Sequence, residues 1–179
     1  MKELKNLYIF ISMGRSIIPN NGSDIVATPQ YLANDIVEYF SPQIGDGVCL
    51  EPCAGTNPFV NALMDAGKPT WWCEISKDRD FFKFDLPVDW IITNPPYSIL
   101  SDFLEHSLSI SNNVVFLVLG NALFFKKRVR LINQYGFAFK EIVFVDTPPK
   151  PWPSFGIQLS VVHLQKNYTG PTQFTHGLK

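Results

Sequence analysis

The chain has 179 residues and a formal net charge of −1, and this length suits one domain around a single core. Hydrophobic residues make up 46% of the chain and charged residues 17%, a composition that excludes a disordered protein. The near-neutral charge argues against a surface that is basic throughout, but it leaves room for a local basic patch.

Three cysteines, Cys49, Cys53 and Cys73, are too few for a disulfide scaffold, and no Cys-x-x-Cys occurs. We therefore expect reduced thiols in a cytoplasmic protein. The apolar segment 7–11 follows two lysines, as in a signal peptide, but it is short and no small-x-small cleavage site follows. No stretch is apolar for long enough to span a membrane, and no spacing of ligands predicts a metal site.

The first predicted helix follows residues 1–27, which we expect to cover the core. Thr28 before Pro29 is typical of a helix start, with Thr28 as the N-cap and Pro29 as the first helical residue. Apolar residues then recur at helical spacing: Leu32, Ile36, Val37 and Phe40.

The first predicted strand, residues 48–50, runs into a loop of small residues at 51–59 that opens a second helix. Asn57 and Pro58 fit the N-cap and the first residue of that helix. Gly55 tolerates a positive φ, and small residues let a ligand approach the backbone. Ligands of doubly wound sheets bind at such strand–loop–helix turns, so this loop is a candidate binding site.

Two further acids follow predicted strands. Glu74 ends the strand 70–73, roughly twenty residues after Glu51, where a carboxylate accepts hydrogen bonds from ribose hydroxyls. A solvated turn residue is the alternative for Glu74. Residues 81–84 predict a short third strand that ends at Asp85, although an ordinary turn would also explain this acid.

A hydrophobic run at 88–93 predicts a buried parallel strand, and the tetrapeptide Asn94-Pro95-Pro96-Tyr97 follows it. The two prolines lack an N–H and fix φ, so the backbone leaves the sheet rigid and extended. The Asn94 side chain and the Pro95 carbonyl supply two acceptors, which suit an –NH2 group. The Tyr97 ring suits the flat molecule that carries this group. An ordinary proline-rich turn is the alternative.

The second half of the chain predicts a helix at 99–108, a strand at 114–119, a helix at 122–135, a strand at 141–145, a last strand at 157–164 and a polar tail at 165–179. The helix at 122–135 carries the dense basic run Lys126, Lys127, Arg128 and Arg130. Such a run is either a solvated helix face or a contact for nucleic-acid phosphates. A proline-dense loop at 148–156 is too rigid and aromatic for a simple linker. Strands that alternate with helices predict a three-layer α/β domain with a seven-stranded sheet.

Asn-Pro-Pro-Tyr after a hydrophobic strand resembles the catalytic motif of S-adenosylmethionine-dependent amino-methyltransferases, above all the N6-adenine DNA methyltransferases. The resemblance covers about residues 28–164, the expected catalytic core, with the motifs in the family order. It departs from the family at Asn57, which replaces the second glycine of the loop, although Asn tolerates a left-handed backbone better than most residues. The resemblance implies a Rossmann-like α/β/α fold and a mostly parallel sheet with an antiparallel last strand.

The resemblance also implies the site, with S-adenosyl-L-methionine as the cofactor and the tetrapeptide Asn94, Pro95, Pro96 and Tyr97 as catalytic residues. The implied cofactor-binding residues are Thr28, Glu51, Pro52, Cys53, Ala54, Gly55, Asn57, Glu74, Ile75, Asp85 and Asn94. Tyr97, with Trp152 or Phe155, would hold a base that has left the duplex. Pro52-Cys53 is similar to the nucleophile motif of cytosine C5 methyltransferases, but it lies on the cofactor loop, so we interpret Cys53 as a packing residue.

The implied reaction is methyl transfer to the N6 amino group of adenine in DNA, by a stand-alone domain similar to phage or restriction–modification enzymes. N6-adenosine methylation of RNA, methylation of a glutamine amide in a protein, and a degenerate cofactor-binding subunit are the alternatives. The spacing between motifs leaves no room for a target-recognition domain. Specificity would then come from short loops, a specificity subunit or a second copy of the chain, and we favour DNA over RNA as the partner.

Overall fold

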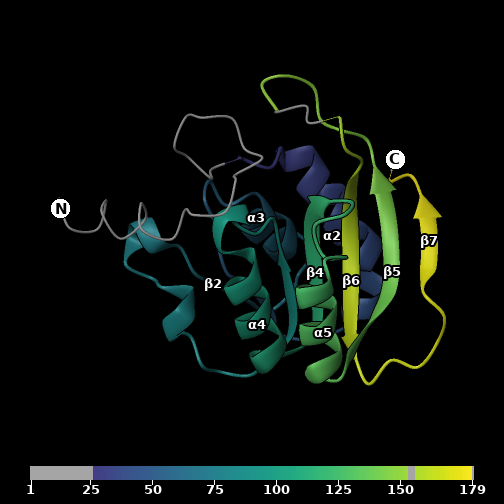
Figure 1. The fold of residues 1–179 in the computed structure, drawn as a ribbon. Helices are drawn as coiled ribbons and strands as arrows, with labels where there is room; N and C mark the ends of the chain where they lie inside the picture. Colours follow the sequence, from purple (N-terminus) through teal and green to yellow (C-terminus); the bar gives the residue numbers. More distant parts are fainter. Residues whose placement is uncertain (1–25, 153–155, 179) are drawn as a thin grey trace.

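The computed structural model describes residues 26–152 and 156–178, so the segment up to residue 25 and the predicted base-binding residue Phe155 lie outside the described structure. A seven-stranded sheet forms the middle layer, with α2 and α3 behind it and α4 and α5 in front (Figure 1). The helices are α2 (Gln30–Ile44), α3 (Pro58–Asp65), α4 (Leu100–Ile110) and α5 (Lys126–Gln134). The strands are β1 (Cys49–Glu51), β2 (Thr70–Trp72), β3 (Val88–Thr93), β4 (Ser111–Leu119), β5 (Phe137–Val145), β6 (Leu159–Lys166) and β7 (Gln173–His176).

The strand order is β2-β1-β3-β4-β6-β5-β7, and all neighbouring pairs are parallel except those that involve β6. The strand predicted as the last, residues 157–164, corresponds to β6 and is antiparallel to both of its neighbours. The predicted three-layer architecture with one antiparallel strand is therefore confirmed.

The central strands have apolar residues on both faces because helices cover both. In β3, Ile91 packs into the cluster beneath α4 and α5, whereas Trp90 and Ile92 pack into the cluster beneath α2 and α3. The same alternation continues through β4, with Val114, Phe116 and Val118 on one side and Val115 and Leu117 on the other. Two hydrophobic clusters thus hold the strands in place, and the strand ends stay open for polar residues.

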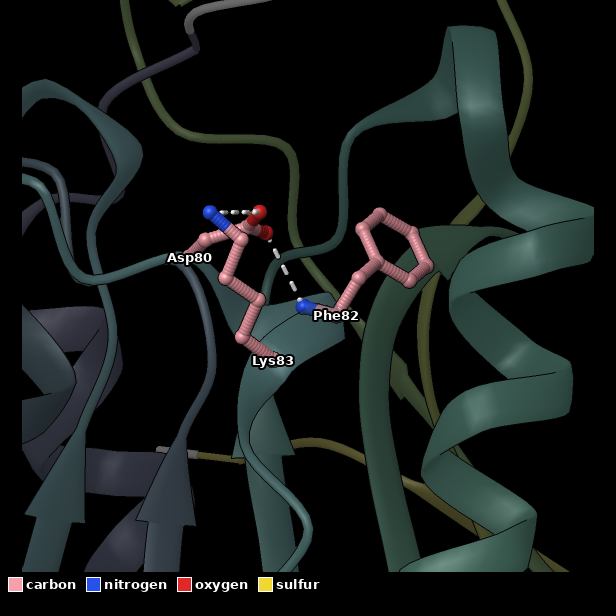
Figure 2. A network of polar contacts seen from close by, with 3 residues as sticks. All are labelled: Asp80, Phe82 and Lys83. Carbon is pink, nitrogen blue, oxygen red and sulfur yellow. Dashed lines mark hydrogen bonds and ion pairs between the residues drawn. The ribbon is translucent and has the colours of Figure 1, made fainter.

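The predicted third strand at residues 81–84 is wrong. Residues Phe81–Lys83 form a short 3-10 helix, η2, because the Asp80 carboxylate accepts the backbone N–H of Phe82 at 3.0 Å and so caps a turn (Figure 2). Lys83 extends back toward Asp80, with its Nζ 3.8 Å from the carboxylate. Phe81 is buried, with its ring centroid 4.6 Å from that of Phe103 in α4, so its burial comes from a helix and not from a sheet. As a result β2 is an edge strand.

The seventh strand lies instead at the other edge of the sheet, inside the segment predicted as a polar tail. Residues of β7 pair in parallel with β5, and the Thr175 hydroxyl donates to the Glu141 carboxylate at 2.7 Å. Phe174 stays 67% exposed, although its ring stacks on that of Phe144. Because β7 is short and mostly exposed, it carries no hydrophobic alternation that would have predicted it.

Two helix starts also differ from the prediction. α2 begins at Gln30, and its N-cap position is held by Pro29, not by Thr28. α5 begins at Lys126 because Ala122 and Leu123 are buried in a turn before the helix. Throughout the described part of the chain, no helix combines the length and the apolar character needed to cross a membrane.

Candidate active site at the carboxyl ends of β1 and β3

The candidate site starts where two adjacent parallel strands end. β1 pairs with β3 in parallel register, so the Glu51 side chain and the residues that follow Thr93 reach the same edge of the sheet. The Thr93 hydroxyl donates a hydrogen bond to Glu51 Oε1 at 2.6 Å. The structure thus joins the start of the predicted cofactor loop to the start of the tetrapeptide predicted to be catalytic.

Glu51 is an acid in a buried environment, with 2% of its surface exposed. Its Oε1 atom also accepts the backbone N–H of Cys53 at 2.9 Å. Burial raises the pKa of Glu51 to about 7, although the hydrogen bonds from Thr93 and Cys53 act in the opposite direction. This carboxyl group therefore changes its charge near neutral pH.

Cys53 completes this buried cluster. Its sulfur lies 2.9 Å from the Thr93 hydroxyl oxygen and donates to the backbone carbonyl of Asn94 at 3.2 Å. Burial, and then the charge of Glu51, hold the pKa of the Cys53 thiol well above its usual value. The thiol is thus a hydrogen-bond donor within the cluster and lacks the thiolate character of a nucleophile.

The loop between β1 and α3 has the backbone that its sequence predicts. Gly55 and Asn57 have φ values of 51° and 72°, so Asn57 takes the left-handed conformation that Asn is expected to tolerate at this position. Asn57 also occupies the N-cap position before Pro58, but its side chain caps nothing. Instead its Oδ1 atom accepts a long hydrogen bond from Lys77 Nζ at 3.4 Å.

Glu74 closes this loop from the side of β2. One carboxylate oxygen accepts the N–H of Gly55 at 2.7 Å, and the other accepts the N–H and the hydroxyl of Ser76 at 3.0 and 2.7 Å. Partial burial alone would raise the pKa of Glu74, but these hydrogen bonds and the charge of Lys77 outweigh it and lower the pKa. The predicted ribose acid is therefore a fixed carboxylate beside the glycine loop, and the neighbouring Ile75 is 53% exposed there.

The turn after β2 carries a second acid besides the predicted Asp85. Glu74 and Arg79 exchange two backbone hydrogen bonds, of 2.8 and 3.1 Å, and Asp80 is the residue that follows Arg79. Asp85 is exposed beyond η2 and takes no part in this contact. Sequence reasoning did not single out Asp80, although an acid two residues before the Phe82 amide is a recognisable turn signal, and its carboxylate caps η2.

The tetrapeptide follows the end of β3. Hydrogen bonds to two different parts of the chain hold the side chains of Asn94 and Tyr97. The Asn94 amide nitrogen donates to the Val26 carbonyl at 3.1 Å and to the Thr28 hydroxyl at 3.2 Å. The Tyr97 hydroxyl accepts the backbone N–H of Leu119 at 2.7 Å, which fixes the ring at the end of β4. The short helix η3 (Tyr97–Ile99) then leads into α4.

The predicted substrate-binding residues fall into different environments. Lys126, Lys127 and Arg130 are exposed and line a groove of about 480 Å³ between α4 and α5, together with Asp102 and Glu105. Arg128 does not share this exposure, because its guanidinium donates to the Ser101 hydroxyl at 3.2 Å and to the Ala122 carbonyl at 2.6 Å. Trp152 is partly buried against the cluster beneath α2 and α3.

Comparison with known proteins gives matches at the level of structure alone. No protein-family model and no curated protein matches the chain. A proposed RNA methyltransferase of Pyrococcus horikoshii superposes with a TM-score of 0.65 at 19% identity, over 93% of this chain and 99% of that one. A proposed class I S-adenosylmethionine-dependent methyltransferase of Listeria monocytogenes gives a TM-score of 0.63 at 12% identity, over 99% of this chain and 73% of that one.

A methyltransferase subunit of the type I restriction–modification system of Streptococcus thermophilus gives a TM-score of 0.58 at 15% identity, over 87% of this chain and 49% of that one. The chain thus spans about half the length of that subunit. Identities this low establish the fold and no more. The chain has the α/β fold of class I S-adenosylmethionine-dependent methyltransferases.

Proposed function

We propose that the chain transfers a methyl group from S-adenosyl-L-methionine to the N6 amino group of adenine in DNA. The observation that carries this proposal is the state of Asn94. Its amide nitrogen is engaged by Val26 and Thr28, which leaves its oxygen as an acceptor, and the backbone carbonyl of the next residue, Pro95, would supply a second one. Two acceptors at the carboxyl end of a central strand, next to a glycine loop, suit an amino group that is to be methylated.

The cofactor would lie along the edge formed by the loop after β1 and the turn after β2. Glu74, which accepts the N–H of Gly55 in the loop, would accept hydrogen bonds from the ribose hydroxyls, and the positive φ values of Gly55 and Asn57 would let the cofactor approach the backbone. We assign the acid beside the adenine ring to Asp80 in place of Asp85, because Asp80 follows Arg79, whose backbone pairs with that of Glu74. When bound, the cofactor supplies an electrophilic methyl group on a sulfonium.

The chain's own residues would then make the amine reactive. The lone pair of an exocyclic amine is delocalised into the ring, so the nitrogen is a weak nucleophile. Hydrogen bonds from the amine to Asn94 Oδ1 and the Pro95 carbonyl stabilise the positive charge that develops on nitrogen. The Tyr97 ring, which Leu119 holds by its hydroxyl, would support the flat face of the base.

DNA is the preferred substrate because several structural neighbours come from type I restriction or restriction–modification systems. A specificity subunit or a second copy of the chain would contribute to recognition of the target sequence. RNA is the second candidate, because the proposed RNA methyltransferase of Pyrococcus horikoshii matches over 99% of its own length. In either case the base must leave a duplex or be presented in a single strand.

The proposal is tested by transfer of a tritiated methyl group from S-adenosyl-L-methionine to DNA, RNA and protein pools in parallel. We expect label in the DNA pool with the wild-type chain and none with Asn94→Ala. Label in RNA alone would favour the second candidate, and label in protein alone would contradict both.

A further inference from the structure

The Asn94 amide has both of its N–H groups occupied. Nδ2 carries two hydrogens, and the structure provides two acceptors for them, the Val26 carbonyl at 3.1 Å and the Thr28 hydroxyl at 3.2 Å. Within residues 26–152 and 156–178, Asn94 Oδ1 has no hydrogen-bond partner, and the side chain is partly exposed. The amide therefore presents an acceptor, and only an acceptor, to an incoming group.

Orientation matters because the two ends of an amide have opposite hydrogen-bonding character. Rotated by 180°, the same side chain would present an –NH2 group, which would repel an amine and attract a carbonyl. Neither the tetrapeptide nor its prolines set this choice, since the two orientations have nearly the same shape. The choice depends on the groups behind the amide.

Thr28 is held firmly enough to set this orientation. It is 7% exposed and precedes Pro29, which restricts its backbone to extended conformations. The start of α2 is tied to α3, because Gln30 Nε2 donates to the Pro58 carbonyl at 2.8 Å and Asn61 Nδ2 donates to Gln30 Oε1 at 3.1 Å. The hydroxyl that accepts from Asn94 thus lies on an anchored segment.

We infer that Thr28 is a positioning residue that holds the Asn94 amide with its oxygen toward the substrate, and so selects a hydrogen-bond donor such as an amine. This inference rests on the proposed function and deepens it. It gives Thr28 a role in the chemical step in place of the cofactor contact expected from its place in the sequence.

The test compares Thr28→Val, which keeps the shape but removes the hydroxyl, with Thr28→Ser, which keeps the hydroxyl. We expect Thr28→Val to lower kcat on an adenine oligonucleotide roughly fivefold to tenfold, the size of one lost hydrogen bond. The Kd for S-adenosylhomocysteine should stay within about twofold of wild type, and Thr28→Ser should restore kcat. A variant that weakens cofactor binding but keeps kcat at saturating cofactor would overturn the inference in favour of a contact with the cofactor alone.

A second readout does not depend on activity. The side-chain NH2 signals of Asn94, assigned by their loss in Asn94→Asp, should exchange slowly with solvent in wild type and Thr28→Ser, and faster in Thr28→Val. Equal exchange in all three proteins would overturn the inference even if methyl transfer is observed. If no nucleic acid is methylated by wild type, the proposed function fails, and the exchange rates still decide whether Thr28 orients the amide.

Discussion

Two buried polar clusters in this chain differ in how their polar groups are hydrogen-bonded and in how burial shifts their pKa values. At the carboxyl ends of β1 and β3, Glu51, Thr93 and Cys53 hydrogen-bond one another, and the Glu51 carboxyl group has a pKa of about 7. In the middle of β6, His163 is fully buried with its ring centroid 5.4 Å from that of Phe40 and 5.1 Å from that of Trp90. Its Nε2 bonds to Asn113 Oδ1 at 3.0 Å, but its Nδ1 has no partner among the described residues.

This difference distinguishes a side chain of the hydrophobic core from a side chain of the candidate site. Burial, and then the charge of Lys140, lower the pKa of His163 to about 3, so this ring is a neutral part of the core. Glu51 instead lies at the start of the proposed cofactor loop, and its charge changes near neutral pH. We expect substitutions in the cluster of Glu51, Thr93 and Cys53 to affect ligand binding as well as stability, and substitutions of His163 to affect stability alone.

The largest effect should come from Asn94→Ala. Removal of a preorganised acceptor for the developing charge should lower kcat by roughly a hundredfold to a thousandfold. The melting temperature should change little, because Asn94 is only partly buried. Steady-state kinetics and thermal melts check this, and normal turnover in the variant would contradict the assigned role.

The His163 ring should make the fold sensitive to acid. Its folded pKa lies below the unfolded value of roughly 6.5, so its contribution to stability is complete above that pH and is lost as the pH falls toward about 3. Urea unfolding at several pH values should show a loss of a few kcal/mol that His163→Phe reduces. His176→Gln, at an exposed position of β7, is the control and should leave the acid sensitivity unchanged.

Loss of the hydroxyl in Thr93→Val should break the hydrogen bonds that join Glu51, Thr93 and Cys53 and so lower the stability of the fold. Glu51 would lose its shortest hydrogen bond, of 2.6 Å, and Cys53 would lose a partner. We expect a destabilisation of about 1–3 kcal/mol in denaturant unfolding. Thr93→Ser keeps the hydroxyl and serves as the control; equal stability of the two variants would show that the hydrogen bond contributes nothing.

The charge of Glu51 should link cofactor binding to pH. Because its folded pKa is raised, Glu51 contributes stability below the unfolded value of 4.5, and this stability is lost as the pH rises through about 7. A cationic cofactor favours the ionised form, so its affinity should increase between pH 6 and 8 on the order of tenfold. Titration calorimetry with Glu51→Gln should give a flat pH profile, and the variant should melt a few degrees higher than wild type at pH 8.

The smallest effect should come from the basic residues of α5. If Lys126 contacts a phosphate, Lys126→Gln should lower the slope of log affinity against log salt by about 0.9 for duplex DNA. Lys166→Gln is a matched control, since this exposed lysine lies at the end of the antiparallel strand β6, away from the candidate site. An equal loss for both lysines would indicate a non-specific charge effect.

The sequence predicted those parts of the fold that depend on local pattern. The apolar runs of β3 and β4 and the positive φ of Gly55 and Asn57 are confirmed, because burial on both faces and a tight loop leave a direct signature. The aromatic run at 81–84 misled the prediction because Phe81 packs against Phe103, which is remote in sequence. Likewise β7 depends on a contact between Thr175 and Glu141 that no local pattern reveals.

The candidate site likewise has residues that a local pattern reveals and residues whose contacts are remote in sequence. The tetrapeptide could be found from its own residues, but the roles of Thr28 and Thr93 could not, because their partners lie 66 and 42 residues away in the chain. The sequence also does not show that Glu74 and Arg79 form a bridge, which is the observation behind the proposal of Asp80 in place of Asp85.

The most direct test of the account is the identity of the methylated atom. Nucleoside analysis by mass spectrometry, after incubation of an adenine-containing single strand with the chain and S-adenosyl-L-methionine, should yield N6-methyladenine that disappears with Asn94→Ala. A methyl group on a ring nitrogen or a carbon atom, or equal product from Asn94→Ala, would contradict the claim that paired oxygen acceptors activate an exocyclic amine.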